Sequence, residues 1–275
     1  MRTPSPITFL SDYGYLDEFV GVCHAVIARR APTVRVIDLT HAILRHDVRS
    51  GASVLGAAIP FLPAGVHLAV VDPDVGATGD HGRRAVAIRT AQEGHLLVGP
   101  DNGLLMPAAA RLRGALEAVD IGCSRERLTP VSRTFHGRDI FAPVAAALAA
   151  GERLSAVGDP LAVSELRPLA LPTARVADGA LFTRVLRADG FGNVILDAQV
   201  KQLAELGLRE GDAVSVHHGG EIRSALFAAT FAHAPAGELL IYDDAQQMLA
   251  LAVNRGSAAA LLDARRDDEL VLRPA

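Results

Sequence analysis

The chain has 275 residues, with 27 Lys+Arg against 31 Asp+Glu, and its single lysine, Lys201, follows no glycine-rich loop. This disfavours both a P-loop nucleotide site and chemistry through a Schiff-base lysine, so cationic roles in catalysis fall to arginine, a permanently charged fork of donors. A formal charge of −4 with no Lys/Arg-rich run argues against a nucleic-acid partner and is compatible with a cationic small ligand.

The first half of the chain predicts alternating strands and helices. Strand-like segments lie at residues 7–14, 34–40, 66–76, 83–90 and 95–103, and helix-like segments lie at residues 18–32, 51–65 and 140–151. Apolar strands that alternate with helices predict a largely parallel sheet with helices on both faces. The first half is therefore expected to be an α/β domain.

The second half changes character after a proline-rich connector at residues 158–179. Short strand-like segments follow at residues 181–197, 212–220, 221–231, 237–244, 248–253 and 268–273, with one helical insert at residues 200–207. DGFGN, at residues 189–193, is typical of a hairpin turn. We place the boundary near Leu171–Val176, which gives an α/β domain at residues 1–172 and a smaller all-β domain at residues 173–275.

Cysteine usage and hydropathy predict the compartment. Cys23 and Cys123 form no CxxC and have no neighbouring ligand spacing, so neither a zinc site nor a disulfide framework is expected. The first residues lack the apolar core of a signal peptide, and no stretch reaches the ~18 apolar residues of a membrane helix. We therefore expect a reduced, cytoplasmic protein without a membrane partner.

Four polar clusters are predicted at strand ends, where ligands bind in open α/β sheets. They are SDYGYLDE, DPDVG, GPDNG and TFHGRD, at residues 11–18, 72–76, 99–103 and 134–139. Each of their key residues could instead have a purely structural role. Asp12 can cap a helix, and Asp72 can form an Asp-Pro turn. Arg83 can be a solvated surface residue, and His136 can be a buried histidine whose hydrogen bonds are all made within the protein. GxGxxG after the first strand and GxSxG are both absent, which disfavours a dinucleotide site and an α/β-hydrolase. It is the joint arrangement that predicts a ligand site.

In this order the clusters resemble the S-adenosylmethionine hydroxide adenosyltransferase family, which includes fluorinating and chlorinating adenosyl-halide synthases. The resemblance covers nearly the whole chain, through ITFLSDYGYLDEFVG, VIDLTH, VVDPDVG, GRRAVAI, GPDNGLL, TFHGRDIFAP, DGFGNVILD, GELL and LALAVNRGSAA. It implies an α/β N-terminal domain joined to an antiparallel C-terminal β-barrel. It also implies a homotrimer that binds its ligand between the N-terminal domain of one subunit and the C-terminal domain of the next.

The implied reaction is attack of water or hydroxide on C5′ of S-adenosyl-L-methionine, giving adenosine and L-methionine. The catalytic set of the hydrolytic branch matches Asp72, Arg83 and His136. Asp72 can accept a proton from water or orient it, His136 can share the proton or position the nucleophile, and Arg83 can hold the carboxylate and stabilise hydroxide. Since the sulfonium leaves as a neutral thioether, neither a metal nor a cofactor is expected.

Two positions separate hydrolysis from halogenation. The halide-using members resemble one another in placing tyrosine where this chain has Asp72, and the fluorinating type places serine where it has Gly137. A carboxylate would repel a halide anion and suits water. Hydrolysis is therefore preferred, and an adenosyl-halide synthase and a non-catalytic nucleoside-binding protein remain as alternatives.

Substrate-holding residues also carry over from the resemblance. They are Asp12 for the ribose hydroxyls, Asp17 and Phe135 as further pocket residues, Asp189 for the methionine ammonium, Asn193 for adenine, Phe191 for ring packing, and Phe231 as a further aromatic wall.

The chain departs from the family pattern at several of these positions. Asp74 replaces a usual glycine, and the turn through ATGDHG is longer than usual, which makes Arg84 an alternative to Arg83. Ala245-Gln246-Gln247 replaces a small Ser/Gly segment, so contacts to the amino-acid part stay open, and a usual lysine in the first helix is His24.

Overall fold

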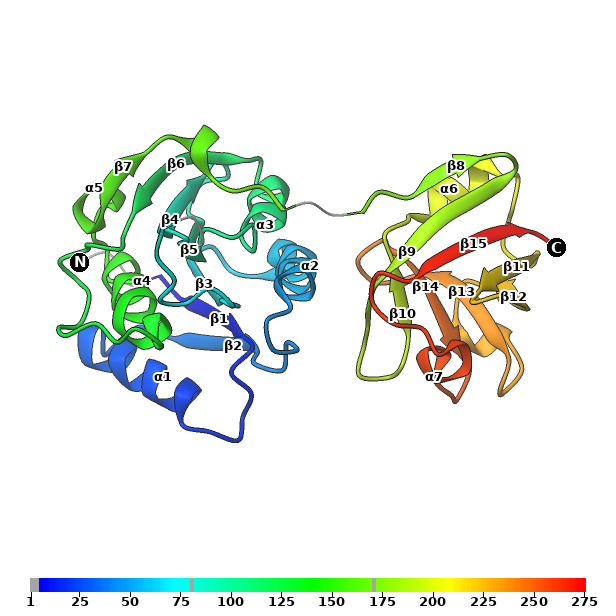
Figure 1. The fold of residues 1–275 in the computed structure, drawn as a ribbon, viewed down its shortest axis with the longest axis horizontal. Helices are drawn as coiled ribbons and strands as arrows, with labels where there is room; N and C mark the ends of the chain where they lie inside the picture. The colour runs from blue at the N-terminus through cyan, green and yellow to red at the C-terminus, as the bar shows by residue number, and fades with distance from the viewer. Residues whose placement is uncertain (1–4, 80–81, 170–171) are drawn as a thin grey trace. The chain divides into compact units, whose positions relative to one another are not determined.

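The computed structural model describes residues 5–79, 82–169 and 172–275, and the chain divides into two compact units, Met1–Ala170 and Leu171–Ala275 (Figure 1). The predicted boundary region begins at Leu171, which lies outside the described residues. Each unit contains its own hydrophobic core. None of the described helices combines the length and the apolar character that crossing a membrane requires.

The first unit is built on a seven-stranded sheet of order β2-β1-β3-β5-β4-β6-β7. Its strands are β1 (Ile7–Ser11), β2 (Val36–Thr40), β3 (Val66–Val70), β4 (Ala85–Thr90), β5 (Leu96–Pro100), β6 (Ala115–Asp120) and β7 (Asp159–Leu161). Strands β1, β2, β3, β5 and β6 run in one direction, and β4 and β7 run against them. The predicted largely parallel sheet is confirmed, with an antiparallel part on the β4 side.

Helices cover both faces of this sheet (Figure 1). They are α1 (Phe19–Arg30), α2 (Val48–Ala58), η1 (Ile59–Phe61), α3 (Met106–Arg111), η3 (Gly137–Phe141), α4 (Ala142–Ala149), α5 (Leu154–Val157) and η4 (Val163–Glu165). Because side chains alternate along a strand, Phe9 packs into the core formed with α1 and α4, whereas Leu10 packs into the core formed with α2 and α3. The sequence did not predict α3, β6 or β7, and β7 lies within the expected connector.

A chain of polar side chains is buried within the same unit. Thr8 Oγ1 lies 2.8 Å from His67 Nδ1, and His67 Nε2 lies 2.9 Å from His95 Nδ1, with the two imidazole rings stacked. Desolvation, with a smaller contribution from the neighbouring His95, lowers the pKa of His67 to about 3, and burial also lowers the pKa of His95. Both rings are therefore neutral in the folded protein at neutral pH.

This network predicts acid-sensitive stability. Below pH ~6.5 the unfolded chain protonates His67 and the folded chain does not, so the free energy of unfolding falls with falling pH, by up to ~1.4 kcal/mol per pH unit. Urea unfolding at pH 7 and pH 5.5 measures this slope, which His67→Gln should reduce. The exposed His233 provides the matched control: His233→Gln should leave the slope unchanged, and equal slopes in all three proteins would contradict the prediction.

The second unit is a closed barrel. Its elements are β8 (Arg175–Ala177), β9 (Ala180–Ala188), β10 (Val194–Leu196), α6 (Val200–Glu205), β11 (Ala213–His218), β12 (Glu221–Phe227), η5 (Phe231–His233), β13 (Leu239–Asp243), β14 (Leu249–Val253), α7 (Ala258–Leu262) and β15 (Glu269–Pro274). The long strand β9 pairs with both β15 and β10, which closes the ring and leaves β8 beside it. The expected barrel is confirmed, and its pairs are antiparallel except β12–β13.

A second short helix, α7, was not predicted. Its first turn is capped by Ser257, whose Oγ accepts a hydrogen bond from the backbone N–H of Ala260 at 3.1 Å. The prediction of one helical insert in this unit was therefore incomplete.

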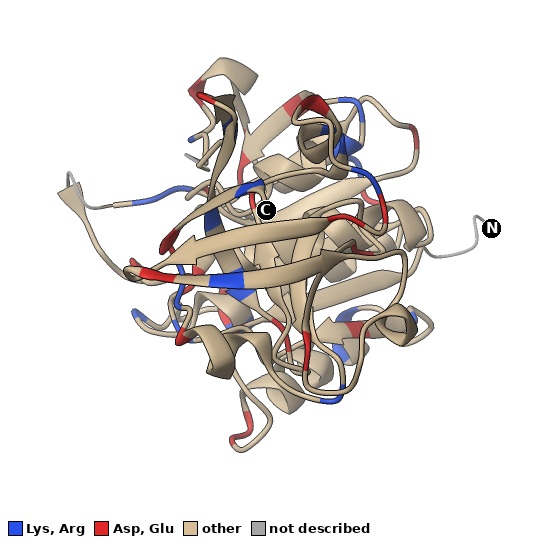
Figure 2. Cartoon of the chain, turned by 90° about the vertical axis from the view of Figure 1, so that its right-hand side faces the viewer, with Lys and Arg blue, Asp and Glu red and all other residues tan. Residues whose placement is uncertain are grey.

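Arginine pairs with an acidic residue on the opposite strand in both units, and Figure 2 shows the two kinds of charge interspersed. Arg89 on β4 pairs with Glu117 opposite it on β6, and Arg184 on β9 pairs with Glu269 opposite it on β15. Exposed pairs of this kind are screened by water and contribute little to stability.

Candidate active site

Three side chains from separate loops form a hydrogen-bonded cluster in the first unit. Asp72 lies just after β3, Arg83 lies just before β4, and His136 immediately precedes η3. Arg83 Nε donates to Asp72 Oδ1 at 2.9 Å and to Oδ2 at 3.0 Å, and Arg83 Nη2 also contacts Oδ2. The same Nη2 lies 2.9 Å from His136 Nδ1. Arg83 therefore bridges the carboxylate and the imidazole.

The cluster is largely buried. The side chains of Arg83 and Asp72 are 4% and 6% exposed, and the guanidinium lies 5.3 Å from the centre of the Phe141 ring. A buried ion pair must repay the loss of water with good hydrogen bonds, and Arg83 supplies one to each oxygen of the carboxylate. The geometry fixes the carboxylate in one orientation.

The contact with Arg83 determines which nitrogen of His136 carries the proton. A guanidinium only donates, so His136 Nδ1 must accept, and the neutral ring carries its proton on Nε2. Burial, and then the positive charge of Arg83, lower the pKa of His136, which favours this neutral form. His136 therefore offers an Nε2–H donor.

The adjacent Arg84 has different partners. Its Nε donates to Asp101 at 2.9 Å, and its Nη1 lies 3.2 Å from Glu165. Successive side chains at the entrance of a strand point to opposite sides, so only one of the two arginines can face Asp72. The structure brings Arg83 into the cluster, and Arg84 ties the end of β5 to η4.

Tyr13, which the sequence analysis did not single out, packs against the same cluster. Its hydroxyl oxygen lies 1.9 Å from where a Cβ on Gly137 would be. Burial raises the pKa of Tyr13 well above its usual value, with smaller contributions from the charges of Cys23, Asp12 and Asp72. The hydroxyl is therefore protonated at neutral pH. Its position directly after Asp12 at a strand end was the signal available in the sequence.

Gly137→Ser should be poorly tolerated in this chain, because the added Cβ would overlap the Tyr13 hydroxyl. Overpacking of this kind costs ~1–3 kcal/mol, which thermal unfolding would detect. Tyr13→Phe combined with Gly137→Ser removes the closest overlap and should restore part of the loss. A Gly137→Ser variant as stable as the parent would show that Tyr13 moves aside freely.

The structure places the other predicted residues of this unit, Asp12, Asp17 and Phe135, in different settings. Asp12 Oδ2 accepts from the backbone N–H of His46 at 2.9 Å, and burial raises the Asp12 pKa. Asp12 does not cap α1, because Glu18 occupies that position. The Phe135 ring packs edge-on against Tyr13 and Phe19, at 5.7 and 5.1 Å between centroids. Asp17 is exposed on the β1–α1 loop.

In the second unit, three of the predicted residues share one cavity. Phe191, Asn193 and Phe231 line a space of about 420 Å³, together with Asn254 and Arg255. The sequence analysis did not single out Asn254 or Arg255, although both lie in the quoted motif LALAVNRGSAA. Phe191 is 84% exposed, so its ring is free to meet a planar ligand.

The fourth predicted residue of this unit, Asp189, organises the turn itself. Its Oδ1 accepts from the backbone N–H groups of Phe191 and Asn193, both at 2.9 Å, and its Oδ2 accepts from the Asn193 side chain at 2.8 Å. The structure therefore supports the turn interpretation for Asp189, and the side-chain oxygen Oδ1 of Asn193 can make other contacts. Residues 245–247 lie in the β13–β14 turn, where Asp244 accepts from the backbone of Gln246 and Met248.

Comparison with known proteins gives one family for both units. Residues 7–158 match the S-adenosylmethionine hydroxide adenosyltransferase N-terminal domain, and residues 183–271 match the corresponding C-terminal domain. A Salinispora tropica protein named (R)-S-adenosyl-L-methionine hydrolase is 47% identical over 97% of both chains. A Nocardia brasiliensis fluorinase is 30% identical over 92% of this chain and 91% of that protein.

A solved structure is also similar. The crystal structure of an uncharacterized conserved protein from Thermotoga maritima has a TM-score of 0.89 and 35% identity, covering 97% of this chain and 99% of that chain. Matches to both domains, and relatives of this identity over nearly the full length, lead to one conclusion. The chain belongs to the S-adenosylmethionine hydroxide adenosyltransferase family.

Proposed function

We propose that this protein hydrolyses S-adenosyl-L-methionine to adenosine and L-methionine by attack of water at C5′. The observation that carries the proposal is the buried Asp72–Arg83–His136 cluster, which offers an anchored carboxylate and an imidazole N–H at the end of β3. The relative named (R)-S-adenosyl-L-methionine hydrolase, at 47% identity, supports the same reaction.

The reaction balances without a further reactant. The water oxygen forms the new bond to C5′, the C5′–S bond breaks, and its electron pair neutralises the sulfonium to give the thioether of methionine. One proton leaves the attacking water. Because the leaving group departs as a neutral thioether, it needs no proton from the enzyme, and the enzyme has mainly to activate the attacking water. A general base together with a donor that positions the water raises the rate ~10²–10⁴-fold.

Each member of the cluster has a role that follows from its contacts. Asp72 accepts the proton of the attacking water, and Arg83 holds that carboxylate in place and offsets the negative charge that develops on the oxygen. His136 donates Nε2–H to the water oxygen, because its Nδ1 is already occupied by Arg83. The carboxylate also disfavours a halide as nucleophile, which opposes the adenosyl-halide synthase alternative.

The proposal extends to substrate binding. Asp12 receives the two ribose hydroxyls, with Phe135 and Asp17 beside the pocket. In the second unit, Asn193 and the rings of Phe191 and Phe231 contact adenine, with Asp189 at the ammonium group. We propose that the site is completed in a cytoplasmic homotrimer, in which the N-terminal unit of one subunit meets the C-terminal unit of its neighbour. Light scattering should then give three chains of 28.8 kDa per particle.

The decisive experiment follows the products of S-adenosyl-L-methionine by mass spectrometry in ¹⁸O-labelled water, with and without chloride. Hydrolysis predicts adenosine carrying one ¹⁸O at the 5′ oxygen, together with methionine, at the same rate in both buffers. Formation of 5′-chloro-adenosine would favour the synthase. Calorimetric binding of adenosine without turnover would favour a nucleoside-binding protein.

A further inference from the structure

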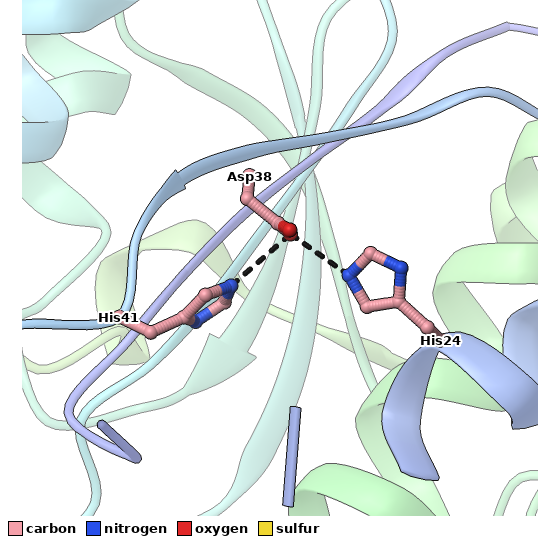
Figure 3. Close-up of side chains that lie close together, drawn as sticks. All are labelled: His24, Asp38 and His41. Carbon is pink, nitrogen blue, oxygen red and sulfur yellow. Dashed lines mark hydrogen bonds and ion pairs between the residues drawn. The ribbon is translucent and has the colours of Figure 1, made fainter. Parts of the chain in front are cut away.

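Three side chains beside the proposed active site converge on one point. They are His24 on α1, Asp38 on β2 and His41 directly after β2, and Figure 3 shows both imidazole rings directed at the same carboxylate oxygen. His24 Nε2 lies 2.8 Å from Asp38 Oδ1, and His41 Nε2 lies 3.1 Å from it. All three potential ligand atoms lie within 4.8 Å of one another.

These separations are close to those of ligands around a transition metal. Zinc–nitrogen and zinc–oxygen bonds of ~2.0–2.2 Å place neighbouring ligand atoms about 3.3 Å apart in a tetrahedron. The two nitrogen-to-oxygen separations, 2.8 and 3.1 Å, are within about 0.5 Å of this value, and the two histidine nitrogens lie within 4.8 Å of each other, so side-chain shifts would bring all three around one ion. Two imidazoles and one carboxylate form a donor set that zinc uses with a water as fourth ligand.

The geometry of His41 distinguishes this cluster from a simple hydrogen-bonded one. The His41 side chain is 0% exposed, and its Nε2 has no hydrogen-bond partner among the described residues although Asp38 Oδ1 is close. Because Ser11 contacts Nδ1 of the same ring, Nε2 is the nitrogen that faces Asp38, and the two are close enough to form an ion pair. A buried nitrogen that faces a carboxylate without the geometry of a good hydrogen bond can share a metal ion with it.

The surroundings of the cluster also match a metal site. Ser11 Oγ lies 2.8 Å from His41 Nδ1, the position from which an outer partner fixes the tautomer of a ligating histidine. On the other side, His24 and Asp38 are 34% and 37% exposed, which leaves a path for the ion and for a bound water. In this cluster the buried ligand His41 is held by Ser11, and the side formed by His24 and Asp38 is accessible to solvent.

We propose that His24, Asp38 and His41 bind one Zn²⁺ ion, separately from the proposed reaction. The ion would join α1 to the ends of β1 and β2, because His41 is tied through Ser11 to the strand end that carries Asp12. Its role is structural: it holds the loop on which Asp12 lies. The proposal does not depend on hydrolysis of S-adenosyl-L-methionine.

The test uses the full-length protein freed of metal with a chelator. Co²⁺ is titrated while the visible absorption of four-coordinate cobalt is recorded, Zn²⁺ then competes, and the melting temperature is measured with and without Zn²⁺. We expect one ion per chain, displacement of cobalt by zinc, and a rise of several degrees in melting temperature.

Three variants show where the ion binds. His24→Lys keeps a cation beside Asp38 but removes a ligand, so it should abolish stoichiometric binding while the metal-free variant unfolds at the parent's temperature. Ser11→Ala removes the outer partner of His41, together with a 3.3 Å hydrogen bond from the Tyr13 backbone N–H, and should weaken binding ~10–100-fold. His218→Ala is the matched control, because His218 forms a His–Asp pair with Asp268 that lacks a second histidine, and it should bind like the parent.

The outcomes divide clearly. Stoichiometric binding that His24→Lys abolishes and His218→Ala retains supports the site. Zinc binding that survives in His24→Lys, or no stoichiometric binding to the parent, overturns it. Adenosine production serves as a separate readout, so a failed zinc site leaves the proposed hydrolysis intact.

Discussion

Asp72→Asn should lower the rate of adenosine formation ~10²–10⁴-fold, because the amide keeps the shape of the side chain but cannot accept a proton from water. The loss should fall on kcat rather than on substrate binding, since Asp72 is proposed to contact the nucleophile and not the nucleoside. Product formation by mass spectrometry and substrate binding by calorimetry measure the two separately.

Stability must be followed in the same variant. Weakening a buried pair leaves Arg83 partly uncompensated, which costs up to ~3–5 kcal/mol, so activity is measured well below the melting temperature. Asp74→Asn, at an exposed position in the same turn, is the matched control and should change the rate less than about threefold. An Asp72→Asn enzyme that turns over at the parent's rate would remove Asp72 from the mechanism.

Arg83→Lys and Arg84→Lys should separate the two adjacent arginines. A lysine ammonium cannot reproduce the fork that contacts both Asp72 and His136, so Arg83→Lys should reduce kcat ~10²–10³-fold. Arg84 contacts Asp101 and Glu165 instead, so Arg84→Lys should cost little activity. The comparison holds charge constant and changes only geometry.

Three measurements check this pair of variants: kcat, the melting temperature and the pH dependence of the rate. In the parent, the rate should fall as the pH falls through the lowered pKa of His136, because protonation places a cation beside Arg83. Arg83→Lys should alter that profile and Arg84→Lys should not. Similar kcat losses in both variants would show that the effect is structural.

The polar cluster was predictable because its members lie at positions where topology leaves little freedom. Asp72 directly follows a buried strand, and His136 precedes a helix that packs on the same sheet. The carboxyl ends of parallel strands lie at the same edge of a sheet, so the loops that follow these strands are expected to lie near one another. The sequence left open whether Arg83 or Arg84 faces Asp72. The long turn before β4 does not show at which residue the strand begins, and the direction of each arginine side chain depends on that start.

Other features depended on contacts between residues distant in sequence. The hydroxyl of Tyr13 fills the space above Gly137, and no local pattern links residues 13 and 137. His24, Asp38 and His41 were missed for the same reason, since they come from a helix, a strand and a loop. The contacts of Asp189 were not predictable either: its oxygens hold the DGFGN turn, which places Phe191 and Asn193 on the lining of their cavity.

By itself, the sequence determined the α/β and all-β halves, the family motifs and the loops that carry polar residues, because strand and helix periodicity and turn residues act over short distances. Tertiary structure alone decided which arginine pairs with Asp72, which nitrogen of His136 carries the proton, and which histidines meet at Asp38. Those outcomes depend on side-chain direction and burial, which arise only when separate elements pack.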